Sequence, residues 1–160
     1  MDTPTVPDSI EIVTYRPELQ PAFEQLNRRW LEANSLLEQA DLDCLLDPER
    51  YVMSTGGEVF FAVQGGNVVG TCAAIRVPPS TVELAKLAVS PDVQGRGIGR
   101  RLCNRVLAFS REAGATEVEL TSNTALTTAI RLYESLGFCH APLKPDIRYA
   151  TADVYMTLRL

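Results

Sequence analysis

Hydrophobic and polar residues along the chain follow two periods, and each period predicts a different kind of element. Alternating or continuous apolar runs, typical of strands, occur at 10–14, 58–77, 81–89, 116–122 and 154–160. Apolar residues at steps of three or four, typical of helices, occur at 19–30, 97–113 and 125–136, and a shorter helix is expected over about 36–46. This order of elements predicts a mixed α/β sheet.

Glycines and prolines mark the ends of these elements. Gly65 and Gly66 divide the run 58–77 into the two strands of a hairpin, and Pro78-Pro79 turns the chain into the strand 81–89. We therefore expect an antiparallel meander of three strands. The residues expected to stop the second and the two later helices are Pro48, Gly114 and Gly137.

The length and the composition indicate one globular domain. The chain has 160 residues, of which 46% are hydrophobic and 22% charged, an ordinary balance for a globular protein. No repeat, low-complexity segment or linker divides it. We expect a single domain over residues 10–160 and a flexible tail over residues 1–9, which show neither a signal peptide nor a strand pattern.

Charge and cysteine content exclude several classes of function. The net charge of −5 argues against a nucleic-acid partner, which needs a basic surface. Apolar runs such as 59–63 are too short to cross a membrane, so no membrane partner is expected. The four cysteines lack the paired spacing of a metal site, which favours reduced, packed thiols in a cytoplasmic protein without a metal. They are Cys44, Cys72, Cys103 and Cys139.

A turn rich in glycine and arginine, "SPDVQGRGIGRR" at 90–101, carries the clearest chemistry. Its glycines follow a strand and open a helix, where missing Cβ atoms and free N–H groups suit a bound anion. Its arginines lie near the positive end of that helix, where cations are disfavoured unless an anion such as phosphate compensates them. The alternative is a flexible turn with solvated arginines. The residues are Gly95, Gly97 and Gly99, with Arg96, Arg100 and Arg101.

Two phosphate ligands are less compatible with this turn. A nucleotide-triphosphate loop ends in Gly-Lys-Ser/Thr, and "GIGRRL" has no such lysine. A dinucleotide fold would use an acid such as Glu119, about twenty residues further on. In that fold, however, the glycines follow the first strand almost directly. Here they follow a meander and the five residues "SPDVQ". A nucleotide-dependent oxidoreductase is thus the weaker alternative.

The stretch 87–138 resembles the core of the GNAT superfamily of acyl-CoA-dependent N-acetyltransferases. It contains the strand end "LAV", the turn "Q-x-x-G-x-G" beginning at Gln94, and "LYESLGF" at 132–138, in the order of that superfamily. The resemblance implies a mixed, mostly antiparallel sheet of six to seven strands flanked by about four helices. It also implies acetyl-CoA as cosubstrate, a small-molecule or protein amine as acceptor, and a homodimer as one assembly open to the chain.

The same resemblance assigns the donor site. It implies that the backbone of Leu87, Ala88 and Val89 pairs with the pantetheine arm and polarises the acetyl carbonyl. It implies that the turn binds the pyrophosphate through backbone N–H groups. The turn residues concerned are Gln94, Gly95, Arg96, Gly97, Ile98, Gly99 and Arg100.

Amine attack on a thioester needs a proton donor for the thiolate and a base for the amine. The resemblance implies Tyr133 as the donor, although Tyr133 also falls on the apolar face of its helix and suits the core. Glu83 is the first candidate base, because strict alternation places it on one strand face with Ala85, Leu87 and Val89, where its pKa would be raised. A salt bridge to Lys86 or to an arginine is the alternative role, a bulge would shift the alternation, and Glu119 is the second candidate.

The chain departs from the superfamily pattern at Leu126, where many members carry an asparagine that contacts the cofactor. Asn123 either replaces that contact or caps the following helix, and capping is the simpler interpretation. His140 lacks the partners of a nucleophilic dyad and is expected at a strand end. No cysteine indicates a covalent acyl-enzyme, which favours direct transfer in a ternary complex.

The sequence therefore predicts an N-acetyltransferase, with a CoA-binding module that has lost turnover as the alternative on the same fold. The acceptor is open. Five acids and no base lie in and just beyond residues 31–46, which leans toward a cationic acceptor, whereas a solvated helix face explains them equally well. They are Glu32, Glu38, Asp41, Asp43 and Asp47.

Overall fold

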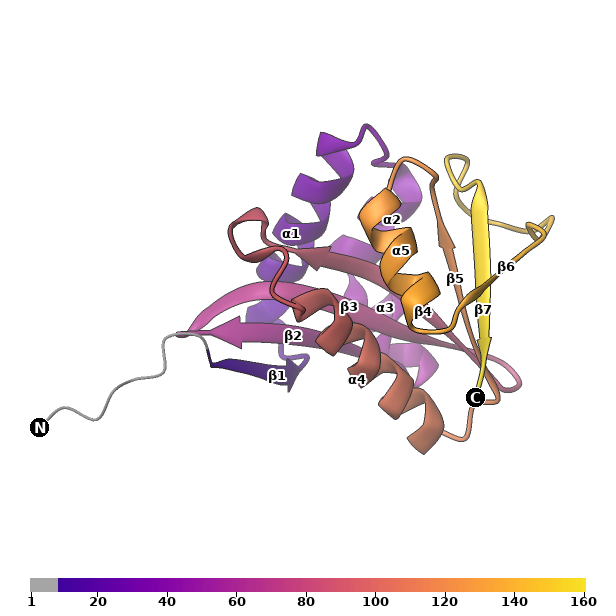
Figure 1. Ribbon diagram of the computed structural model, residues 1–160. Coiled ribbons are helices and arrows are strands. Elements are labelled where there is room, and N and C mark those ends of the chain that lie inside the picture. Colours follow the sequence, from indigo (N-terminus) through magenta and orange to yellow (C-terminus); the bar gives the residue numbers. More distant parts are fainter. Residues whose placement is uncertain (1–8) are drawn as a thin grey trace, which may run out of the picture.

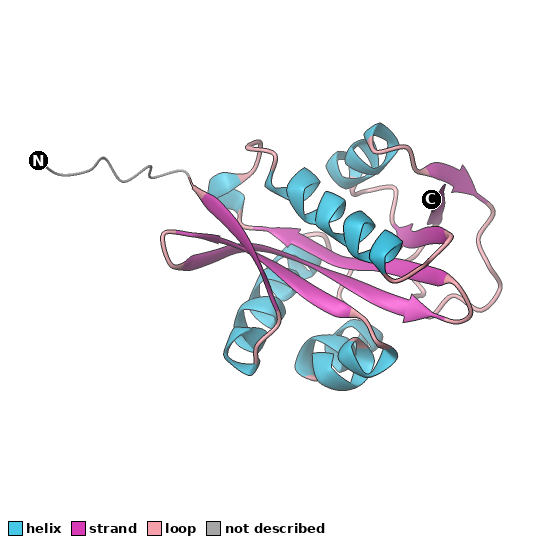
Figure 2. Ribbon diagram, turned by 90° about the horizontal axis from the view of Figure 1, so that it is seen from below, coloured by secondary structure: helices cyan, strands magenta, loops and turns pink. Residues whose placement is uncertain are grey.

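The computed structural model describes residues 9–160 and shows one seven-stranded sheet with helices on both faces (Figures 1 and 2). The tail expected over residues 1–9 lies outside the described residues except for Ser9. The strands are β1 (Ile10–Thr14), β2 (Glu58–Gln64), β3 (Asn67–Val77), β4 (Thr81–Val89), β5 (Glu117–Ser122), β6 (Cys139–Ala141) and β7 (Val154–Arg159). The helices are α1 (Gln20–Ala33), α2 (Gln39–Leu46), α3 (Pro48–Tyr51), α4 (Ile98–Glu112) and α5 (Thr127–Ser135).

The sheet is mostly antiparallel, as the sequence predicts. Its strand order is β1-β2-β3-β4-β5-β7-β6, and only β4 and β5 pair in parallel. The predicted meander is present as β2, β3 and β4. Gly65 and Gly66 form its first turn with φ of +56° and +81°, a conformation that glycine adopts without steric cost. His140, expected at a strand end, is the middle residue of the short edge strand β6.

Pro48 follows the end of the second helix, as predicted, and also begins a further short helix. Helix α2 ends at Leu46, and Pro48 is the first residue of α3. The carboxylate of Asp47 accepts a hydrogen bond from the Arg50 N–H at 3.2 Å and so caps this turn. Proline fits the first position of a helix because its missing N–H would have no partner there.

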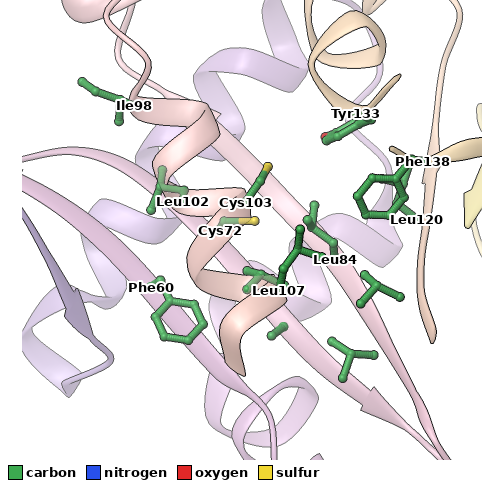
Figure 3. Packing of buried hydrophobic residues seen from close by; sticks show 14 of the residues in the cluster. Phe60, Cys72, Leu84, Ile98, Leu102, Cys103, Leu107, Leu120, Tyr133 and Phe138 are labelled. Atoms are coloured by element: carbon green, nitrogen blue, oxygen red, sulfur yellow. The ribbon is translucent and has the colours of Figure 1, made fainter. Parts of the chain in front are cut away.

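Two hydrophobic clusters lie on opposite faces of the sheet. Helices α4 and α5 cover one face, where Leu102 and Leu107 pack against residues of the strands such as Phe60 (Figure 3). Helices α1 and α2 lie on the other face, where Phe23 packs edge-on against Phe61. Because both faces are covered, the run "VFFAV" of β2 is apolar throughout rather than alternating.

The strands β4 and β5 diverge (Figure 1). Their pairing runs only from Thr81↔Glu117 to Glu83↔Glu119, although β4 continues to residue 89 and β5 to residue 122. The second half of β4 therefore has no β5 partner, and an opening forms between the two strands.

A bulge in β4 changes the alternation that the sequence suggests. Lys86 has a φ of +57°, and the pairing with β3 shifts between Thr71 and Ala73. As a result Ala85 packs against the cluster around Phe23, whereas Leu87 and Val89 pack against the cluster of α4 and α5. The prediction that Glu83 shares one face with both Leu87 and Val89 is wrong for this reason.

All four cysteines are free thiols, and all but Cys139 are buried, as expected. Within residues 9–160, no group of three or more His, Cys, Asp or Glu side chains is placed to hold a metal ion. No helix in this described part is long and apolar enough to cross a membrane. The cytoplasmic location stays a prediction.

Candidate active site

Two pockets meet at the opening between β4 and β5. The larger one, of about 340 Å³, lies along the glycine turn and the end of β4, and we name it the turn pocket. The smaller one, of about 110 Å³, lies between α1, β4, β5 and the β6–β7 segment (residues 142–153), and we name it the strand pocket. The residues that line both pockets are Trp30, Leu87, Leu126 and Tyr133.

The glycine turn gives the turn pocket an open backbone wall. Gly95 and Gly97 have φ of +82° and +77°, and a Cβ atom added to either would meet no protein atom within 4 Å. The turn leads directly into the 15-residue helix α4, whose first N–H groups have no intrahelical acceptors. Ile98 is buried under this first turn (Figure 3). The turn is therefore firmly anchored and offers the open backbone and free N–H groups that binding of an anion requires.

Gly99 has a different role from the other two glycines. A Cβ at this position would lie 3.2 Å from Leu132, so its absence lets α4 and α5 pack closely. The two neighbouring arginines, Arg100 and Arg101, also point to different places. Arg100 lines the turn pocket and donates to Ser135 at 2.8 Å, whereas Arg101 donates to the carbonyl of Ile10 at 2.9 Å, toward β1. Of these two arginines, only Arg100 is placed to offset a charge in the turn pocket.

The structure brings most of the predicted donor-binding residues together. Leu87, Ala88, Val89 and the turn residues from Gln94 to Arg100 line the turn pocket, except Arg96. Asn123 lines the strand pocket instead.

The capping interpretation of Asn123 is wrong. The N-cap of α5 is Leu126, and the Oδ1 of Asn123 accepts from the Ala125 N–H at 2.8 Å in the preceding turn. Its Nδ2 donates to the Thr151 carbonyl at 2.6 Å, which ties the β6–β7 segment to the end of β5.

Tyr133 is both a core residue and a wall of the two pockets. Its ring packs edge-on against Phe138, with centroids 6.0 Å apart, and its side chain lies beside Cys103 (Figure 3). Burial, together with the nearby thiols of Cys103 and Cys72, raises its pKa well above the ordinary value. The phenol therefore keeps its proton at neutral pH, which is the state a proton donor needs.

Glu83 lines the strand pocket, and burial raises its pKa despite the opposing charges of Arg148 and Lys86. Its ion pair with Arg148 is a single contact of 3.5 Å between its Oε1 and the guanidinium. Glu119, its neighbour in register on β5, is more firmly engaged, because its Oε2 accepts from Lys144 and from the Tyr155 hydroxyl, both at 2.7 Å. Of the two candidate bases, Glu83 is the one that faces the pocket.

A buried ion pair holds the bulge of β4 in place. The ammonium of Lys86 pairs with the carboxylate of Asp41, and the side chains are 7% and 6% exposed. It also donates to the Tyr149 hydroxyl at 3.2 Å and lies 4.6 Å from the centre of that ring. Burial opposes the charge of Lys86, but Tyr149 and Asp41 hold its pKa above the ordinary value. Lys86 thus joins α2, β4 and the β6–β7 segment.

Replacing Asp41 with asparagine should lower the free energy of unfolding by about 3 kcal/mol, because it leaves a buried ammonium without its carboxylate. Urea denaturation measures the loss. Asp43→Asn is the matched control, since Asp43 on the same helix makes only an exposed hydrogen bond to Gln39. Equal stability of the two variants would contradict the role given to the ion pair. The double variant Asp41→Asn, Lys86→Met should recover part of the loss.

Each acid of the 31–46 region is already engaged by a partner of its own, including Asp41, which lines the strand pocket and is paired with Lys86. Glu38 accepts from the N–H groups of Ala150 and Thr151 at 2.9 and 3.0 Å and also from the Thr151 hydroxyl. Burial opposes its charge, but these hydrogen bonds hold its pKa below the ordinary value. The other four bond to Arg28, Lys86, Gln39 and the Arg50 N–H. They therefore give no independent support to a cationic acceptor.

Several pocket residues escaped prediction from the sequence. Trp30 continues the apolar period of α1, which gives no sign of a pocket residue, yet it lines both pockets. Tyr149 and Thr151 lie in a segment with no regular pattern, so nothing pointed to them. Lys86 did leave a signal, because a lysine within the apolar strand "TVELAKLAV" needs a buried partner.

Comparisons with known proteins agree with this geometry. A model of the acetyltransferase (GNAT) family matches residues 16–138. N-acetyltransferase family 8 member 2 of Rattus norvegicus is 38% identical over 105 residues, which are 62% of this chain and 45% of that protein. N-acetylaspartate synthetase of the same organism is 40% identical over 108 residues, which are 63% of this chain and 36% of that protein. This chain thus spans less than half the length of these relatives.

Solved structures share the whole fold at low sequence identity. An acetyltransferase of the GNAT family from Staphylococcus aureus Mu50 has a TM-score of 0.86 and 19% identity, covering 95% of this chain and 99% of its own. A protein of Salmonella typhimurium, solved with its cofactor acetyl-CoA, has a TM-score of 0.78 and 22% identity, covering 96% and 95%. These structures support the arrangement of strands and helices described above.

Proposed function

Because the chain belongs to the GNAT family of acetyltransferases, we propose that it transfers an acetyl group from acetyl-CoA to a primary amine. The transfer is direct, with both substrates bound at once. The acceptor is a small-molecule or protein amine.

The observation that carries this proposal is the junction of the two pockets. Tyr133 and Leu87 line both of them, so a donor in the turn pocket and an acceptor in the strand pocket would reach the same side chains. A single junction of this kind suits attack of one substrate on the other, because holding both in place converts a bimolecular step into a unimolecular one. No cysteine is needed to carry the acetyl group between the pockets.

The turn pocket fits acetyl-CoA by the chemistry of its walls. The open backbone at Gly95 and Gly97 and the start of α4 suit the pyrophosphate, with Arg100 beside them. The half of β4 without a β5 partner, Leu87 to Val89, offers backbone groups to the pantetheine arm. When bound, acetyl-CoA supplies the acetyl group as an activated thioester and departs as CoA.

The protein contributes the two proton transfers. Glu83 takes a proton from the amine, directly or through water, since its raised pKa makes it a better base than an ordinary carboxylate. Tyr133, protonated at neutral pH, gives a proton to the departing sulfur. The backbone around Leu87 polarises the acetyl carbonyl by hydrogen bonding.

The experiment that tests this function measures free thiol. Incubation with acetyl-CoA and a broad panel of amines should release CoA only when an amine is present. Acetyl-CoA, but not NAD, should raise the melting temperature. Binding of acetyl-CoA without thiol release across the whole panel would contradict the enzyme proposal and leave a binding module.

Changing Gly97 to alanine should raise the Kd for acetyl-CoA about tenfold, because the new Cβ projects into the space proposed for the pyrophosphate. Isothermal titration calorimetry measures it. Gly114→Ala is the matched control, since Gly114 also has a positive φ, +78°, and equally open surroundings, but lies at the far end of α4. Both variants should lose about 1 kcal/mol of stability. Equal Kd values for both variants would argue against the pyrophosphate cradle.

A further inference from the structure

Glu83 lines the strand pocket and forms a loose ion pair with Arg148, which is not itself one of the lining residues. Glu83 is 15% exposed and fixed on the strand β4, whereas Arg148 is 53% exposed and lies on the irregular β6–β7 segment. One nitrogen of the guanidinium approaches the carboxylate at 3.5 Å, and its planar group lies 5.8 Å from the centre of the Tyr149 ring. An arginine has five N–H donors in a fork that matches a carboxylate. Only one of these donors is in contact with Glu83.

The other charges around Glu83 are already paired. Lys86 is held by Asp41, and Lys144 is held by Glu119. A molecule that enters beside Glu83 therefore meets one carboxylate and one arginine of opposite charge. A ligand that carries only a positive charge would replace Arg148 in the ion pair with Glu83. The guanidinium would then lie beside another positive charge without a carboxylate. A molecule with both an ammonium and a carboxylate would satisfy both groups.

We propose that the acceptor is a small free α-amino acid, with its amino group at Glu83 and its carboxylate bound by the Arg148 guanidinium. This rests on the proposed acetyltransferase function and names its substrate class. The amino acid exchanges one ion pair for two and brings no net charge into the pocket. The strand pocket, with a volume of about 110 Å³, has room for the amino group and the α-carbon beside Glu83, and the carboxylate reaches Arg148 next to the pocket.

The acetyl transfer to such an acceptor is balanced without any other reactant. The α-ammonium gives a proton to Glu83, and the nitrogen forms a bond to the acetyl carbon as the carbon–sulfur bond breaks. The amine nitrogen loses a second proton to solvent, and the sulfur receives the proton of Tyr133, which solvent then restores. The products are an N-acetyl amino acid and CoA.

The first test compares acceptors that differ only in the carboxylate. Glycine, alanine, serine and aspartate are assayed against glycinamide, alaninamide and ethylamine by CoA release. We expect kcat/KM for alanine to exceed that for alaninamide by roughly 10- to 100-fold, the size of one charge-assisted interaction. The amide has the more easily deprotonated amino group, so any chemical bias opposes this result. Equal or better use of the amide would overturn the proposal and favour a peptide terminus.

The second test changes the arginine. Arg148→Gln should raise KM for alanine roughly 10- to 100-fold with little change in kcat, and should leave alaninamide unaffected. Arg148→Lys should restore part of the affinity. Lys144→Gln is the matched control, because Lys144 belongs to the same segment and pairs with Glu119 instead; it should keep the preference for the carboxylate. An unchanged preference in Arg148→Gln would overturn the assignment.

Different results would refute the proposal of an amino-acid acceptor and the proposal of an acetyltransferase function. If simple amines release CoA and amino acids do not, the amino-acid acceptor is wrong and the acetyltransferase function stands. If no amine of either kind releases CoA, the proposed function fails as well. Thermal unfolding of each variant with and without acetyl-CoA shows that the turn pocket is intact.

Discussion

Tyr133→Phe is expected to lower kcat about 100-fold while the Kd for acetyl-CoA changes less than about twofold. The substitution removes one hydroxyl and keeps the ring that packs against Phe138. Burial raises the pKa of Tyr133, so the hydroxyl keeps its proton at neutral pH and is available to hydrogen-bond and protonate the departing sulfur. Without that proton, CoA must leave as a thiolate or take a proton from water.

Rapid-quench or steady-state measurement of CoA release gives kcat, and calorimetry gives the Kd. Tyr15→Phe is the matched control, since the Tyr15 hydroxyl makes only an exposed contact to Glu49 at 3.4 Å. It should keep full activity. A Tyr133→Phe enzyme with unchanged kcat would remove Tyr133 from the chemistry and leave it as a core residue.

Glu83→Gln is expected to lower kcat/KM about 100-fold and to change the pH profile. In the wild type, kcat/KM should fall as the pH drops below the raised pKa of Glu83, because the protonated carboxyl cannot accept the amine proton. In the variant this fall of kcat/KM at low pH should be absent, and the remaining pH dependence should come only from ionisation of the acceptor amine. Glu119→Gln should cost less than about fivefold, since Glu119 is engaged by Lys144 and Tyr155. The reverse order would make Glu119 the base.

The same raised pKa has a consequence for stability. Folded Glu83 binds its proton more tightly than unfolded Glu83, so stability falls as the pH rises from the ordinary pKa of glutamate through the raised one. Above that window the folded protein carries a partly buried charge that the neutral amide of the Glu83→Gln variant lacks. The melting temperature of the variant should therefore be higher than that of the wild type at pH 8, and the two melting temperatures should be equal at pH 4. A lower melting temperature of Glu83→Gln at pH 8 would contradict the raised pKa.

Most of the fold could be predicted because its elements are locally determined. The run 81–89 is rich in apolar residues and forms one strand, and the apolar period of 97–113 ends at Gly114, where the structure has a positive φ of +78°. The turn at Gly65-Gly66 fixes the hairpin. The short helix α3 was not predicted, because a proline after a helix end can also be the first residue of the next helix.

The site was only partly predictable, because its decisive features depend on partners far along the chain. The bulge at Lys86 follows from a buried pair with Asp41, 45 residues away. The contact of Arg148 with Glu83 spans 65 residues and joins a segment without regular structure to a strand. Periodicity describes neighbours within one element, so it can indicate that Lys86 needs a buried partner but cannot identify the partner of either residue. The glycine turn, in contrast, is a local structure, and its residues alone predict it.

The measurement that tests the central claim most directly is a full matrix of initial velocities, with CoA release followed as acetyl-CoA and the amine are both varied. Direct transfer at the junction of the two pockets predicts intersecting double-reciprocal lines and no CoA release before the amine is added. Parallel lines, or a burst of one CoA per protein in the absence of amine, would show an acetyl group held on the protein and would contradict the account.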